Sequence, residues 1–110
     1  MELPPVVKIE IFIPDDCMDA LAEALHGAGA GRIGNYDHCM SIINVTGTWR
    51  PLEEAKPFLG EVGKICRGSE LKVEVNCAAE NVPAALQAIR QVHPYEEPVI
   101  NITPLLNHLF

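Results

Sequence analysis

The sequence predicts a single α+β domain over residues 1–110, in which two β-α-β units contribute to one antiparallel sheet. Apolar and polar residues alternate in "VKIEI" (7–11) and again in "LKVEV" (71–75), as is typical of half-buried strands. An amphipathic helical pattern follows each stretch in the same phase, and an extended stretch follows each helix. This repeat predicts a ferredoxin-like split β-α-β fold, with a four-stranded antiparallel sheet and two helices on one face.

The elements are expected in the order β-α-β-β-α-β, with strands near 6–13, 38–46, 70–77 and 98–103 and helices near 16–28 and 80–92. The glycines that follow His26 end the first helix. Asn81 and Pro83 fit the start of the second helix. That helix ends at His93, because a residue before proline is disfavoured in helical conformation. The expected core is aliphatic: Ile9, Ile11, Leu21, Leu25, Val73, Val75, Leu86 and Ile89.

The charge balance excludes two classes of partner. The net charge is −7 and only eight residues are Lys or Arg, so neither nucleic acid nor an anionic membrane is expected to bind. No apolar run approaches the roughly 20 residues of a membrane span, and the N-terminus lacks the pattern of a signal peptide. We therefore expect a cytoplasmic protein whose four cysteines are reduced.

The open sheet face and the long connection 46–69 favour self-association. Helices on one face leave the other face and both edge strands uncovered. The connection carries Trp49 and Phe58, which a small monomer shelters poorly, and loops of this length tend to be functional. The sequence therefore predicts an oligomer with clefts between its subunits, and the family resemblance given below implies that it is a homotrimer.

The topology indicates which loops meet. The connection 46–69, the turn 14–17 and "HPYEEP" (93–98) are expected at one end of the sheet. The loop 27–39 is expected at the other end, so His38 and His93 approach each other only across a subunit interface.

A small ligand between subunits is one interpretation of these polar stretches. Its candidate residues are His93, Tyr95, Glu96, Asn35, Tyr36 and Trp49. In the alternative interpretation, Pro94 and Pro98 hold the exit from the second helix rigid, and "HPYEEP" is a structural seam.

A divalent metal ion is the only cofactor considered, with His38, Cys39 and His93 as weak candidate ligands. No Cys-x-x-Cys or His-x-x-x-His spacing supports it, and solvated loop histidines are the alternative. No catalytic residues are predicted. Cys39 and His38 are adjacent in sequence, and the side chains of adjacent residues in a strand point to opposite faces. The sequence also lacks a nucleophile elbow and a phosphate-binding loop.

Four motifs carry a family resemblance: "GAGRIGNYDHC", "GTWRP", "KPFLGEVG" and "HPYEEP". Together they resemble the inserted middle domain of the YqfO family, the dinuclear-metal-centre hexameric proteins. The likeness runs from Val6 to Leu106, as in a standalone version of that domain. The "HPYE-P" element is also similar to the CutA family, trimeric proteins associated with divalent-cation tolerance, whose fold is broadly that of PII signalling proteins.

The resemblance implies a non-enzymatic accessory or interaction domain that forms trimers. The metal ligands of YqfO-type proteins lie in flanking halves, so none is carried over to a position here. Two alternatives remain: a PII-like sensor of a small ligand, and a CutA-like protein that binds copper or zinc.

Overall fold

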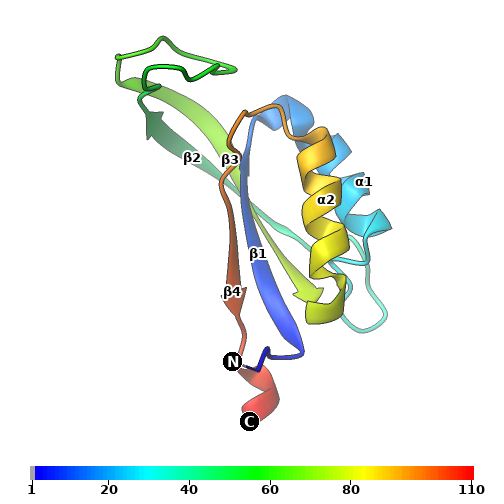
Figure 1. Cartoon of the computed structure of the whole chain (residues 1–110). Coiled ribbons are helices and arrows are strands. Elements are labelled where there is room, and N and C mark those ends of the chain that lie inside the picture. Colours follow the sequence, from blue (N-terminus) through cyan, green and yellow to red (C-terminus); the bar gives the residue numbers. More distant parts are fainter. Residues whose placement is uncertain (1) are drawn as a thin grey trace.

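The computed structural model describes residues 2–110 and confirms the predicted fold class. The strands are β1 (Val6–Ile13), β2 (Ser41–Trp49), β3 (Cys66–Ala78) and β4 (Ile100–Pro104), and the helices are α1 (Met18–Gly27) and α2 (Val82–Val92). Short 3-10 turns lie at Asp15–Cys17, Ala79–Asn81 and Asn107–Leu109. The sheet has the order β2-β3-β1-β4 with antiparallel pairing throughout, and both helices cover one face of it (Figure 1).

The core lies between the two central strands and the helices. In β1 every second residue from Val7 to Ile13 is buried, and the register places Ile9 opposite Val75 on β3. Seven of the eight predicted core residues are buried: Ile9, Ile11, Leu21, Leu25, Val73, Val75 and Ile89. Their burial follows from the alternation and the helical spacing that the sequence shows.

Leu86 was wrongly predicted to be buried and is only half-buried. Ala85 and Ile89 lie one helical turn apart on α2 and face the sheet, and neither has any exposed area. Because successive residues of a helix are rotated by about 100°, Leu86 turns to the flank of the helix.

The bounds of β2, β3 and β4 differ from the prediction, most of all at the starts of β2 and β3. β2 begins at Ser41 because His38 has a φ of 54°, a left-handed conformation that does not fit a strand. β3 begins at Cys66 because its pairing with β2 continues outward, with Gly47 opposite Gly68 and Trp49 opposite Cys66. The two ends of the predicted connection are therefore paired strands that carry the loop 50–65, and together they form a projecting arm, which we define as residues 46–69.

The open face of the two central strands is polar. Lys72 Nζ lies 3.3 Å from Glu10 Oε2, and Lys8 Nζ lies 3.5 Å from Glu74 Oε2. Asn101 on β4 donates a hydrogen bond of 3.0 Å to Glu10. This network satisfies the charges of the face within one chain.

The arm and the segment after α2 lie at one end of the sheet, and the loop 28–40 lies at the other, as predicted (Figure 1). The arm extends away from the helices and makes the molecule elongated, with extents of 47 × 32 × 22 Å. Neither helix of the described chain has the length and apolar character needed to cross a membrane.

Candidate functional site

A cleft at the base of the arm lies beside the polar residues of "HPYEEP". It has a volume of about 290 Å³, at the lower end of the range of roughly 300–1,000 Å³ for small-molecule pockets. Four aromatic side chains line it: Phe12, Trp49, Phe58 and Tyr95. The charged residues of the lining are Arg50, Glu70, Glu96 and Glu97, so carboxylates outnumber cations.

His93 supports this cleft from behind, with 8% of its surface exposed. Its Nε2 lies 2.6 Å from the carbonyl oxygen of Phe12, an acceptor, so Nε2 carries the proton. Its Nδ1 accepts the backbone N–H of Tyr95 at 3.2 Å. Burial lowers the pKa of His93, which keeps the ring neutral. Because both ring nitrogens are used within the chain, a metal ion could bind His93 only by displacing one of these hydrogen bonds.

Tyr95 points its phenol into the cleft. Its hydroxyl donates a hydrogen bond of 3.1 Å to Glu70 Oε2, and its ring lies 4.7 Å from that of His93 and 6.1 Å from that of Phe58. Burial, followed by the negative charge of Glu70, raises the pKa of Tyr95 to about 12. The phenol is therefore a neutral hydrogen-bond donor near neutral pH, and it is poorly suited to act as a base.

Trp49 holds the loop at the end of the arm. Its indole Nε1–H donates a hydrogen bond of 3.0 Å to the carbonyl oxygen of Leu59. The backbone passes close to the indole at Gly60 and Gly68, where an added Cβ would lie 2.9 Å and 3.2 Å from ring atoms. Glycine at these positions lets the chain pack directly on the indole.

Glu96 ties the same loop to the segment after α2. The backbone N–H of Lys56 donates a hydrogen bond to Glu96 Oε2. Such a bond, between residues far apart in sequence, fixes the loop relative to Tyr95. Glu96 therefore has a structural contact within the chain.

The six residues predicted to bind a ligand do not form one site within a single chain. Trp49, Tyr95 and Glu96 line the cleft, and His93 lies behind Tyr95. Asn35 and Tyr36 are exposed in the loop 28–40 at the opposite end of the sheet (Figure 1). Only a second subunit could bring these two groups together.

His38, a predicted metal ligand, lies in that distant loop. Its Nδ1 is 2.9 Å from Asp37 Oδ1 and its Nε2 is 3.2 Å from Glu23 Oε1. These two hydrogen bonds, Asp37 first, raise the pKa of His38. The thiol of Cys39 donates to the carbonyl oxygen of Asp37 at 3.6 Å.

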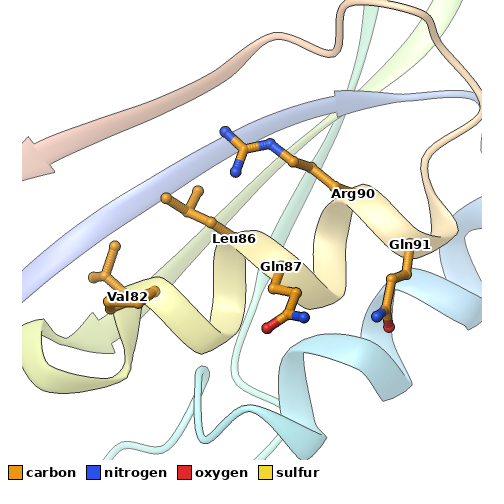
Figure 2. Close-up of a pocket in the computed structure, with 6 residues that line it drawn as sticks. Val82, Leu86, Gln87, Arg90 and Gln91 are labelled. Atoms are coloured by element: carbon orange, nitrogen blue, oxygen red, sulfur yellow. The ribbon is translucent and has the colours of Figure 1, made fainter.

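A second hollow of about 560 Å³ lies along the outer surface of α2 (Figure 2). Leu86 and Arg90 extend from one side of the helix, and Gln87 and Gln91 extend from the other. All of the residues that line the hollow belong to this one helix, so no second element closes over a ligand. We therefore assign no site to it.

The sequence did not indicate several partners of the cleft residues. Glu70 accepts the hydrogen bond of Tyr95 and lies in β3. In the sequence it could not be distinguished from any other charged residue on the exposed face of a strand. The partners of Trp49 and Glu96 are backbone groups of Leu59 and Lys56, which carry no signal in the sequence.

No family model matches the sequence, but curated proteins do. The chain is 39% identical over 100 residues to the GTP cyclohydrolase 1 type 2 homolog of Halalkalibacterium halodurans, covering 91% of this chain and 27% of that protein. The homolog of Mycobacterium leprae is 40% identical over 99 residues, covering 90% of this chain and 26% of that protein. The chain thus spans about a quarter of the length of these relatives.

Solved structures show the same relationship. A Bacillus cereus protein related to NIF3 superimposes with a TM-score of 0.83 at 32% identity, covering 97% of this chain and 27% of that one. CutA1 of Shewanella sp. SIB1 superimposes with a TM-score of 0.72 at 24% identity, covering 96% of this chain and 86% of that one, and shares the fold. The chain is therefore homologous to a segment of the NIF3-related (YqfO-type) proteins named GTP cyclohydrolase 1 type 2 homologs, and this segment has a CutA-like fold.

Proposed function

We propose that this chain is a non-catalytic accessory domain of the YqfO type that assembles as a homotrimer. The observation that carries the proposal is the outer edge of the sheet. β2 is an edge strand, and its neighbours Ile42 and Ile43 point to opposite faces with 50% and 43% of their surfaces exposed. An edge strand with apolar side chains on both faces is a ready template for pairing with another chain.

Further apolar surface continues around the other edge and the arm. Ile102 on β4 and Val99 before it are exposed by 42% and 51%, and Phe58 on the arm is exposed by 54%. Contact between subunits would remove this surface from water, which stabilises association by about 25 cal/mol per Å² of apolar area before the entropic cost of association. A trimer covers these edges in a closed ring.

Two of the four thiols, Cys17 and Cys77, support a non-catalytic role. Burial raises the pKa of Cys77, and burial with the neighbouring Asp16 raises the pKa of Cys17. A raised pKa reduces the fraction of thiolate, the nucleophilic form. Burial holds His93 in its neutral form behind the cleft, and burial together with Glu70 holds the phenol of Tyr95 neutral in its lining.

Light scattering tests the assembly. We expect a mass of about three times 12.0 kDa at micromolar concentration. Ile43→Lys should shift the mass downward, because it places a charge in the proposed interface, and Trp49→Ala or Tyr95→Ala should act in the same direction. Gln91→Lys on the exposed surface of α2 is the matched control and should leave the mass unchanged. A wild-type monomer would refute the trimer.

A sensor of a small ligand is the second candidate, favoured by the cleft of about 290 Å³ at the base of a projecting arm. The aromatic lining with excess carboxylates suits a small ligand that has an apolar body and hydrogen-bond donors or positive charge. A screen by melting temperature identifies such a ligand, since saturation at 100 times the dissociation constant stabilises the fold by about 2.7 kcal/mol. Tyr95→Phe should weaken the binding of a ligand that occupies the cleft, whereas Tyr36→Phe in the distant loop should leave its affinity unchanged.

A further inference from the structure

The strongest unassigned cluster lies at the end of the sheet opposite the cleft. α1 ends in the turn that carries His26, and the loop 28–40 then leads back towards it. Two backbone hydrogen bonds anchor this loop: Gly31 N–H to the carbonyl oxygen of Asn76 at 2.8 Å, and Cys39 N–H to that of Gly31 at 2.9 Å. The anchored loop holds His38 beside the last turn of α1.

The two imidazoles are stacked, with ring centroids 4.3 Å apart and ring planes 20° from parallel. Asp37 contacts one nitrogen of His38, and Glu23 contacts the other. Glu23 lies three residues before His26, on the same side of α1. One donor atom each from His26, Asp37 and His38 lies within 4.8 Å of the other two.

We propose that His26, Asp37 and His38 bind a divalent first-row transition metal ion of the Zn²⁺ type, with Glu23 as the hydrogen-bond partner that orients His38. The site is independent of the trimer and of the cleft.

The donor set fits this class of ion. Imidazole and carboxylate ligands suit zinc, copper and nickel, and three protein ligands leave one position for water. With metal–ligand bonds of about 2.0–2.2 Å, the donor atoms of a tetrahedral site lie roughly 3.3 Å apart. The three side chains are exposed, so modest rotations can bring their donor atoms together without disturbing the core.

The present hydrogen bonds of His38 prepare the bound state. If Nδ1 binds the ion, Asp37 can move from that nitrogen to the metal, and the Nε2–H continues to donate to Glu23. A histidine ligand that donates its second N–H to a carboxylate is the usual arrangement around protein-bound metals. The net charge of −7 further favours a cation.

Calorimetric titration with Zn²⁺ near neutral pH tests the site in the intact chain. We expect one ion per chain, and His26→Ala and His38→Ala should each abolish saturable binding. Glu23→Gln should weaken it by about 10–100-fold, because the orienting carboxylate is lost while the ligands remain. His108→Ala is the matched control, since His108 is also exposed but lies in the C-terminal 3-10 turn, and it should bind as the wild type does.

Two further measurements identify the ligands. In NMR spectra, Zn²⁺ should shift the ring signals of His26 and His38 and leave those of His93 and His108 in place. Cys39→Ser should retain full affinity, because the thiol is not among the three donors. Circular dichroism verifies that each variant is folded. Affinity that survives both His26→Ala and His38→Ala, or that depends on Cys39 or His93 instead, would overturn the assignment.

Discussion

His93 Nε2 donates a hydrogen bond of 2.6 Å to the carbonyl oxygen of Phe12, which joins the end of α2 to the end of β1. The same ring accepts the backbone N–H of Tyr95 through Nδ1 and so fixes the start of the segment that lines the cleft. One buried imidazole therefore links the core to the candidate ligand site.

His93 should make the protein less stable in acid. Its pKa lies below the ordinary value of 6.5 in the folded state, chiefly because burial penalises the charged ring. As the pH falls below about 6.5, the unfolded chain binds a proton before the folded chain does, so the free energy of unfolding decreases. The contribution is fully present above that pH. Denaturant unfolding followed by Trp49 fluorescence at several pH values measures it.

His93→Gln isolates this contribution, because glutamine can donate to Phe12 but does not titrate. The variant should lose part of the wild-type dependence on pH in the acid range. His108→Gln, at an exposed position, should keep the wild-type dependence. The assignment is wrong if His93→Gln and the wild type lose stability in parallel as the pH falls.

Tyr95 should ionise only at about pH 12, because it is half-buried beside the carboxylate of Glu70. In Tyr36→Phe, Tyr95 is the only tyrosine, and the ultraviolet absorbance of phenolate then reports its ionisation alone. Glu70→Gln in the same background should lower the pKa, though not to the ordinary value of 10.0, since burial is the largest single cause of the shift and remains. Ionisation near pH 10 in a chain that circular dichroism shows to be folded would contradict the placement of Tyr95.

Leu25→Ala and Ile89→Ala should each reduce the free energy of unfolding by about 2–5 kcal/mol, because both side chains are fully packed in the core. Leu86→Ala removes a side chain of the same size from the half-buried flank of α2 and should cost clearly less. Chemical denaturation of the three variants gives the comparison. Equal losses would show that the orientation of α2 is wrong.

Gly60→Ala should loosen the arm. Gly60 has a φ of 101°, and an added Cβ would lie 2.7 Å from Cys66 Sγ and 2.9 Å from Trp49 Nε1. The clash should displace the indole, and the emission of Trp49, the single tryptophan, should change.

Gly63→Ala is the matched control for this clash. Gly63 has a φ of 82°, but no atom lies within 4 Å of an added Cβ, so only the backbone strain of about 1 kcal/mol remains. Its emission should match the wild type. Identical spectra for Gly60→Ala and the wild type would show that the loop is not packed on Trp49.

The sequence by itself determined the element order, the buried faces and the ends at which the loops lie. These depend on local patterns: alternation in β1 and β3, helical spacing in α1 and α2, and Pro94, which keeps His93 out of the helix so that α2 ends at Val92. Such patterns follow from backbone geometry that each segment has on its own. The fold class and the family resemblance could therefore be predicted without coordinates.

Only the tertiary structure decided which groups of the chain the polar side chains contact. Phe12 and His93 are 81 positions apart, Tyr95 and Glu70 are 25 apart, and His38 and Glu23 are 15 apart. Short-range spacing contains no information on contacts of this kind, because they depend on strand register and on where the loops return. For this reason the sequence indicated both His93 and His38 as candidate metal ligands and did not distinguish them. In the structure both ring nitrogens of His93 form hydrogen bonds within the chain. His38 instead lies beside His26 and two carboxylates.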